Sequence, residues 1–165
     1  MKTHPSIRLA KIGMSKGMRV ADLGAGKGLF TLAAAGVVGP DGLVYSVEPD
    51  TSRAALIERR LLAERLANVR VLVTGAERLA DIPDSTIDIA FSLNSIHHFR
   101  DRTAAFAEAK RILKLGGRFY VRDIVRSWLT RHGTRREDVT ALSSSGFSDR
   151  RIKMSSWTLE ATFTK

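Results

Sequence analysis

The chain has 165 residues, of which 44% are hydrophobic and 27% are charged, and this is the composition of one folded domain rather than of a disordered segment. It contains no cysteine, which excludes disulfide scaffolds, cysteine-ligated zinc, iron–sulfur clusters and thiol nucleophiles. Its net charge of +10 attracts polyanions but carries no information about the fold.

Short β-branched runs alternate with helical patterns, which predicts a parallel sheet covered by helices on both faces. The first strand is expected at 19–22, where it ends in a glycine-rich turn, and a helix of small residues follows at 27–36. A second strand at 43–48 stops at the sequence Pro-Asp-Thr-Ser of 49–52, which also caps a helix that runs to about residue 67.

The second half of the chain continues this alternation. Further strands are predicted at 69–73, 87–93 and 118–124, a helix between Asp101 and Gly116-Gly117, a short polar helix at 137–145, and a closing strand pair at 151–155 and 159–164. The pattern predicts a single domain over 1–165 with a Rossmann-like, doubly wound α/β fold. Its sheet would be mostly parallel and seven-stranded, with a C-terminal antiparallel strand pair.

The apolar segments of the chain are short. The longest, residues 29–39, is interrupted by Thr31 and falls short of the roughly 18 residues that a membrane span requires. The first eight residues contain no apolar core of the kind found in secretory leaders. We therefore expect no membrane segment and a cytoplasmic location, since a reducing compartment suits a chain without cysteine.

The sharpest sequence feature is Val-Ala-Asp-Leu-Gly-Ala-Gly-Lys-Gly at residues 20–28, which follows a strand and opens a helix. Such a turn exposes backbone N–H groups and lets a ligand approach without Cβ atoms in the way. It fails as a P-loop, because that motif requires glycine at the position of Ala21 and serine or threonine at Gly28. A dinucleotide-binding turn would have its third glycine at Leu29, so that alternative is weakened but stays open.

The segment 22–28 closely resembles the nucleoside-binding turn, Asp/Glu-x-Gly-x-Gly-x-Gly, of class I S-adenosylmethionine-dependent methyltransferases. Later segments match that family in the same order: Glu48 at the end of the second strand, 74–79 after the third, 94–99 after the fourth, and Leu-Lys-Leu-Gly-Gly-Arg at 113–118 before the fifth. The resemblance covers most of the chain. It is greatest to the ubiquinone/menaquinone-biosynthesis type, whose small-molecule enzymes carry a similar His-His pair after the fourth strand.

The resemblance implies that the chain binds S-adenosylmethionine. Asp22 would meet the methionine ammonium group, directly or through water, and Glu48 would accept hydrogen bonds from the ribose hydroxyls. Many relatives have aspartate at the position of Gly75 to accept from the adenine amine, so either Glu77 takes that role here or the contact is absent. The implied cofactor residues are Asp22, Leu23, Gly24, Ala25, Gly26, Glu48, Pro49, Gly75, Ala76, Glu77, Asn94 and Ser95. Two of the acids also have a structural alternative, Asp22 as a cap of the turn and Glu48 as a favourable charge at the next helix.

Two adjacent histidines follow the fourth strand. They lack a third ligand at metal spacing, so no metal site is expected. In relatives the second histidine tends to be buried, so we assign His98 to packing. We assign His97 to the acceptor side as the candidate catalytic base, because the ordinary pKa of an imidazole lies near neutrality.

The identity of the methyl acceptor stays open among three functions. A small-molecule methyltransferase is favoured by the His-His segment. An RNA or protein methyltransferase is the second function, since the chain is basic and short lids leave the pocket open, unless a second copy closes it in a homo-oligomer. RNA would bind the basic C-terminal third through Arg122, Arg126, Arg131, Arg135 and Arg136, with only Asp123 as a nearby acid. A non-catalytic module that binds S-adenosylmethionine or nucleic acid is the third.

Overall fold

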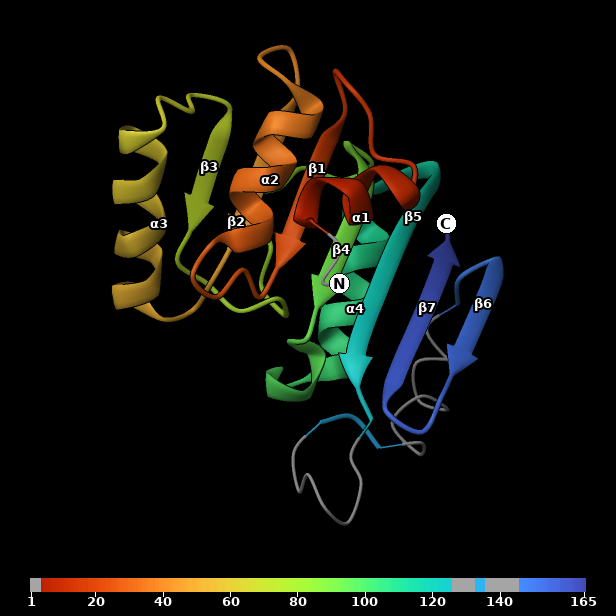
Figure 1. The fold of residues 1–165 in the computed structure, drawn as a ribbon. Coiled ribbons are helices and arrows are strands. Elements are labelled where there is room, and N and C mark those ends of the chain that lie inside the picture. Colours follow the sequence, from red (N-terminus) through yellow and green to blue (C-terminus); the bar gives the residue numbers. More distant parts are fainter. Residues whose placement is uncertain (1–3, 126–132, 136–145) are drawn as a thin grey trace.

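The computed structural model describes residues 4–125, 133–135 and 146–165 of the chain. At its centre is a seven-stranded sheet in the order β3-β2-β1-β4-β5-β7-β6 (Figure 1). The strands are β1 (Arg19–Leu23), β2 (Leu43–Val47), β3 (Val69–Leu72), β4 (Ile87–Leu93), β5 (Leu113–Ile124), β6 (Asp149–Met154) and β7 (Thr158–Thr164). Strands β1 to β5 pair in parallel, whereas β7 is antiparallel to both β5 and β6. The predicted fold class, including its C-terminal antiparallel pair, is confirmed.

Helices cover both faces of this sheet. The helices are α1 (Pro5–Lys11), α2 (Leu29–Val38), α3 (Thr51–Ala63) and α4 (Arg102–Ile112), and a short 3-10 helix, η1 (Ile96–His98), follows β4. Figure 1 shows α1 and α2 in front of the sheet and α4 behind it. The doubly wound arrangement follows from the strand sequences, because successive side chains of a strand point to opposite faces and both faces are apolar here.

The core accordingly lies in two layers. In front of the sheet, Leu9 of α1 and Val20 of β1 belong to one buried apolar cluster. Behind it, Phe106 of α4 packs edge-on against Phe119 and Phe163, with ring centroids 5.0 and 5.4 Å apart. The second cluster joins α4 to β5 and β7 and so holds the antiparallel strands to the parallel part of the sheet.

The junction between α4 and β5 differs from the prediction. Gly116 and Gly117 do not end the helix, because α4 already ends at Ile112 and the chain becomes strand at Leu113. Leu113 is fully buried and pairs with Ile87 of β4. The glycine segment continues the strand through an irregularity at Gly116, whose φ is 76°, and is held by Lys165, since Gly116 N donates to Lys165 O and Lys165 N donates to Gly117 O, both at 3.0 Å.

Other predicted boundaries shift for local reasons. Helix α3 ends at Ala63 and not near residue 67, because Arg65 adopts a left-handed conformation with φ of 54° that closes the helix. Helix α1 was not predicted, since its seven residues are too few to show a helical period. The polar helix predicted at 137–145 falls outside the described residues.

Candidate functional site

A cavity of about 1080 Å³ opens beyond the carboxyl ends of the parallel strands. These strands run in one direction, so the loops that follow β1, β2, β3 and β4 meet at the same edge of the sheet (Figure 1). The lining comprises residues 24–26, 48–50 and 53, 73–78, 93–95, 98–101 and 104. Four loops that are far apart in the sequence therefore line one continuous cavity.

The turn after β1 brings bare backbone to the cavity. Gly24 and Gly26 have φ angles of 81° and 60°, a left-handed conformation that glycine adopts without strain. Gly24 N donates to Val47 O at 2.9 Å, and this bond holds the turn against the end of β2. A Cβ on Gly24 would lie 2.7 Å from the side chain of Ser95, so only glycine lets these two loops approach.

Glu48 faces the cavity from the end of β2 and is only 3% exposed. Its Oε2 accepts from Gly26 N at 2.7 Å, and its Oε1 accepts from Asp50 N at 3.1 Å. Arg53 of α3 lies 3.9 Å from the same Oε1. A carboxylate has about four acceptor positions, so Glu48 braces the turn and retains acceptor capacity for hydroxyl groups of a ligand.

Asp22 lies beneath the turn and not on the cavity surface. Its side chain is buried and its Oδ2 accepts from Thr31 Oγ1 at 2.7 Å. The pKa of Asp22 is raised to about 7, because burial raises it most, the Thr31 hydrogen bond partly offsets this, and the negative charge of Glu48 adds to the rise. The two acids next to the turn therefore differ in surroundings, one facing the cavity and one sealed below it.

In the loop after β3, the side chain of Glu77 fills the space beside Gly75. Gly75 has no side chain, and a Cβ built on it would collide with the carboxylate of Glu77. The Glu77 carboxylate therefore occupies the position where a side chain of residue 75 would begin. Both residues line the cavity, together with Ala76, which is 3% exposed.

The segment after β4 forms the wall opposite Glu48. Ser95 Oγ donates to Leu23 O at 3.0 Å and lies 2.7 Å from Ser92 Oγ, which ties this segment to the end of β1. Asn94 adopts a left-handed conformation, with φ of 58°, and its backbone N donates to Arg122 O at 2.7 Å. Both Asn94 and Ser95 line the cavity.

The two histidines occupy the reverse of their expected positions. His97 is the buried one and His98 lies at the cavity, so the expected assignment is wrong. The His97 side chain is only 4% exposed, and its Nδ1 lies 2.8 Å from Oδ1 of Asp123, which is itself fully buried. His97 N also donates to Asp123 Oδ2, and Thr134 Oγ1 donates to the same oxygen. His98 is exposed and lines the cavity. Because adjacent side chains diverge, the sequence indicated that only one of the two rings would face the cavity, but it did not determine which one.

The structure gathers ten of the twelve implied cofactor residues around this one cavity, and the other two, Asp22 and Leu23, lie buried under the turn. Eleven further residues line the cavity and were not in the implied cofactor set. These are Asp50, Arg53, Val73, Thr74, Arg78, Leu93, His98, Phe99, Arg100, Asp101 and Ala104. Their position after the strands could have indicated them, since residues that follow the carboxyl end of a parallel strand face this edge of the sheet.

Two features were searched for among the described residues and were not found there. Within 4–125, 133–135 and 146–165, no group of three histidine, cysteine or carboxylate side chains is placed to hold a metal ion. None of the helices described is long and apolar enough to cross a membrane.

The sheet order, the glycine turn and the buried acid after β2 define a domain of the class I S-adenosylmethionine-dependent methyltransferase type. Residues 21–121 match the family model described as "Methyltransferase domain", and the chain belongs to this family.

The chain is similar to the ubiquinone/menaquinone biosynthesis C-methyltransferase UbiE of Burkholderia cenocepacia, at 31% identity over 123 residues, covering 73% of this chain and 49% of that protein. It thus spans about half the length of the curated relatives it matches. Its fold is similar to a crystal structure of a SAM-dependent methyltransferase from Aquifex aeolicus, with a TM-score of 0.82, 22% identity, and 96% and 88% of the two chains covered. A phosphoethanolamine N-methyltransferase from Haemonchus contortus, solved with S-adenosylhomocysteine, has a TM-score of 0.76 at 22% identity over 90% of this chain and 38% of that one.

Proposed function

We propose that this chain transfers a methyl group from S-adenosylmethionine to a small-molecule acceptor. The observation that carries the proposal is the single cavity lined by ten residues of the implied cofactor set, contributed by four separate loops. The family to which the chain belongs supports the reaction type. The similarity to UbiE-type C-methyltransferases supports a small acceptor. We place the reaction in the cytoplasm, on the reducing conditions that suit a chain without cysteine.

The residues of the cavity fit S-adenosylmethionine, which when bound supplies a methyl group already activated on a sulfonium. Glu48 would hold the ribose hydroxyls, because it keeps acceptor capacity beside the turn. Gly24 and Gly26 present backbone without side chains to the methionine part. Glu77 would accept from the adenine amine, because its carboxylate stands where a side chain of residue 75 would begin.

Beyond this, the protein has to orient the acceptor and keep water out. The acceptor would be held where it can take up the methyl group that the bound cofactor supplies. Asn94 and Ser95 would line this region, and His98, Phe99 and Arg100 border it on the acceptor side. A proton lost by the acceptor would pass to water or to His98, which replaces His97 as the candidate base because it lines the cavity.

A transfer assay with tritiated S-adenosylmethionine and fractionated cell extract tests the proposal. We expect label in the small-molecule fraction, and less label there with the Glu48→Gln variant at a cofactor concentration below saturation. Label confined to RNA or to protein would contradict a small acceptor. An absence of S-adenosylhomocysteine binding by calorimetry would contradict the cofactor itself.

The second function, RNA methylation through the C-terminal arginines, gains nothing from the described residues. Arg122 forms an ion pair with Glu160 at 3.2 Å, so Asp123 is not its only acidic neighbour. Asp123 is fully buried against His97 and cannot neutralise a surface. Arg135 already has an interaction partner. The remaining arginines of that prediction, Arg126, Arg131 and Arg136, fall outside the described residues.

A further inference from the structure

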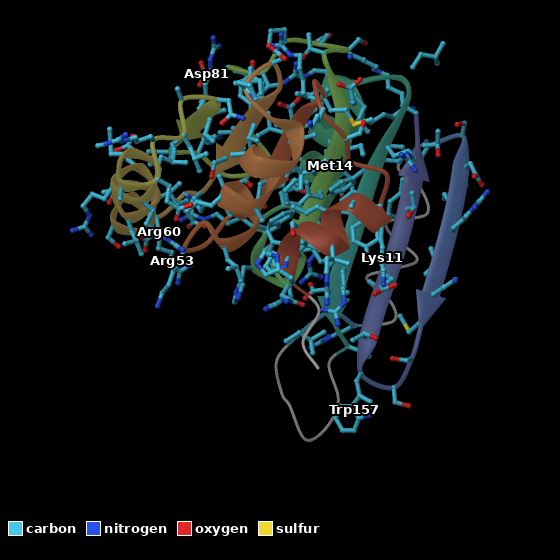
Figure 2. The ribbon with its side chains drawn as sticks, turned by 45° about the horizontal axis from the view of Figure 1, so that its top comes forward. Lys11, Met14, Arg53, Arg60, Asp81 and Trp157 are labelled. Atoms are coloured by element: carbon cyan, nitrogen blue, oxygen red, sulfur yellow. The ribbon has the colours of Figure 1, made fainter. Side chains whose placement is uncertain are left out.

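A second hollow, of about 520 Å³, lies between α1 and the sheet, away from the cofactor cavity. Its floor is the front face of β5 and β7, and β6 borders it at the sheet edge. Figure 2 shows Lys11 projecting from α1 on the side of these strands. No residue of this hollow lines the cofactor cavity, so it is a separate surface.

Four basic side chains border the hollow, and three of them have no acidic partner among the residues that the structure describes. Arg8, Lys11 and Arg118 form no ion pair with any residue that the structure describes. Arg8 and Arg118 are half-buried, and the Arg118 guanidinium lies against Gly13 just beyond the end of α1. Like charges held together and partly removed from water repel each other, so this arrangement favours an anion between them.

The two acids at the hollow do not cancel this charge. Glu160 is already paired with Arg122, 3.2 Å away. Asp149 Oδ1 accepts from the backbone N of Arg150 at 2.8 Å, and Asp149 Oδ2 lies 3.7 Å from Arg151 Nε. The cations contributed by α1 and by β5 therefore have no compensating acid within the part of the chain that the structure describes.

The strand register extends the basic surface toward the cofactor cavity. Tyr120 pairs with Thr162, which pairs with Arg151, and these three form one row across the sheet. The next row along β5 contains Arg122, whose guanidinium lies 3.5 Å from Oδ1 of Asn94 in the cavity wall. A chain-like ligand that follows these two rows would reach the edge of the cofactor site.

Phosphate groups joined in a flexible chain match this surface best. A groove of basic side chains that follows a backbone, with an aromatic ring on which a base can stack, is how proteins hold single-stranded nucleic acid. The half-buried ring of Tyr120 and the hydroxyls of Thr162 and Thr164 lie on the floor between the cations. A membrane surface fits less well, because the apolar lining residues, Ile12 and Ile89, are half-buried and buried and do not project from the hollow.

We propose that this basic sheet surface, formed by Arg8, Lys11, Arg118, Tyr120 and Arg151, binds the phosphate backbone of single-stranded RNA without sequence preference. The proposal goes beyond the methyl-transfer function and does not depend on it, because none of these residues touches the cofactor cavity. The net charge of +10 brings the polyanion to the protein, and the three unpaired cations fix where it binds.

Fluorescence anisotropy with a labelled oligouridylate of about ten nucleotides tests this. The triple variant Arg8→Gln/Lys11→Gln/Arg118→Gln should bind at least tenfold more weakly than the wild type. The slope of log affinity against log salt should shrink by about 2, since each phosphate contact on a single strand contributes about 0.7. Wild-type protein that fails to bind the oligonucleotide at low salt would overturn the proposal.

A matched control removes the same charge elsewhere. Arg59, Arg65 and Arg70 are exposed and lie at α3 and β3, the opposite end of the sheet. Their triple glutamine variant should bind RNA within about twofold of wild type, whereas an equal loss in both triples would show attraction by total charge alone and defeat the proposal. Both variants must keep wild-type affinity for S-adenosylhomocysteine, which shows that they are folded. If vesicles of phosphatidylglycerol bind in a way that needs Arg8, Lys11 and Arg118 and RNA does not, the surface serves a membrane and the RNA proposal is wrong.

Discussion

At the scale of single residues, surroundings give chemically similar side chains different tasks. Glu48 and Asp22 flank the same turn, yet one accepts backbone N–H bonds at the cavity surface and the other is sealed below with a hydroxyl partner. His97 and His98 are neighbours, yet one is held by a buried carboxylate and the other is exposed. Three predictions follow from particular atoms at this scale.

Replacing Glu48 by glutamine should weaken S-adenosylhomocysteine binding by about 1.5–3 kcal/mol, the range for hydrogen bonds to a charged group. The amide keeps the size of the side chain but loses the charge and one acceptor oxygen. Isothermal titration calorimetry measures the effect. The matched control is Glu58→Gln on the exposed side of α3, which should leave the affinity unchanged. An unchanged affinity in a folded Glu48→Gln protein would remove Glu48 from the binding site.

Removing the carboxylate at position 77 should weaken cofactor binding, and adding one at position 75 should restore it. Glu77→Ala should weaken S-adenosylhomocysteine binding about tenfold, the low end for a bond to a charged group. Adding Gly75→Asp to that variant should recover most of the loss, because the new carboxylate starts where the Glu77 carboxylate stood. Gly75→Asp alone should lower the melting temperature, since two carboxylates then compete for one space. Equal affinities of Glu77→Ala and wild type would refute the adenine contact.

The raised pKa of Asp22 predicts how stability depends on pH. Folding raises this pKa from its ordinary value of 3.8 to about 7, so the folded chain holds the proton more tightly than the unfolded chain. The resulting stabilisation is complete below pH 3.8 and is lost as the pH rises from there to about 7. Urea titrations should therefore show the free energy of unfolding of the wild type falling between about pH 4 and pH 7, relative to Asp22→Asn. Parallel curves for the two proteins would mean that Asp22 is ionised throughout.

At the scale of elements, β5 organises the part of the cavity wall that follows β4. Asp123, near its end, accepts from the backbone N of His97 in η1 and from Thr134, and so ties three segments to one buried carboxylate. Asn94 is joined to the same strand through Arg122 O. The short η1 helix has little stability of its own, so β5 holds His98 and Phe99 at the cavity.

His97→Ala and His98→Ala should separate stability from function. Removing the His97 ring takes one partner from the buried Asp123 carboxylate, which keeps its bonds from Thr134 and from the backbone, and a lost bond to a charged group costs about 1.5–3 kcal/mol. For a chain of this size we expect a melting temperature lower by about 4–10 °C. His98→Ala should change the melting temperature little but slow methyl transfer by about 10²-fold if the imidazole takes the proton. Calorimetric melting of both variants decides the stability half, and a greater loss in His98→Ala would reverse the roles.

At the scale of the whole molecule, the cofactor cavity exists only in the folded sheet, because its four loops are separated by helices and strands. A ligand that spans them binds the native state alone and stabilises it by mass action. The closure of this open cavity by a second copy of the chain stays a prediction, and light scattering with and without S-adenosylhomocysteine measures it.

Saturation with cofactor should therefore raise the melting temperature selectively. At about one hundred times the dissociation constant, S-adenosylhomocysteine should add about 2.7 kcal/mol, which corresponds to about 5–10 °C for a domain of this length. NAD and ATP at the same concentration should leave the transition where it is, since the turn has neither the third glycine of a dinucleotide site nor the serine or threonine of a P-loop. A shift with NAD comparable to that with S-adenosylhomocysteine would contradict the cofactor assignment.

The sequence by itself determined the order of strands and helices, the glycine turn after β1 and the acid after β2, because these depend on residue types at short spacing. It also indicated a turn that presents backbone without Cβ atoms, and in the structure Gly24 of this turn has a φ of 81°. Its error at Gly116-Gly117 arose because glycine commonly ends helices, whereas here pairing with Lys165 holds the segment within β5.

Only the tertiary structure decided which side chains face the cavity, since that depends on partners distant in the chain. His97 turned inward because Asp123, 26 residues later, is buried beside it. Glu77 stands in the space of residue 75 because the loop folds back on Gly75. The basic sheet surface joins α1 to β5, β7 and β6, from opposite ends of the sequence. Short-range pattern specifies the elements, and long-range burial and hydrogen bonding then select the orientation of each functional side chain.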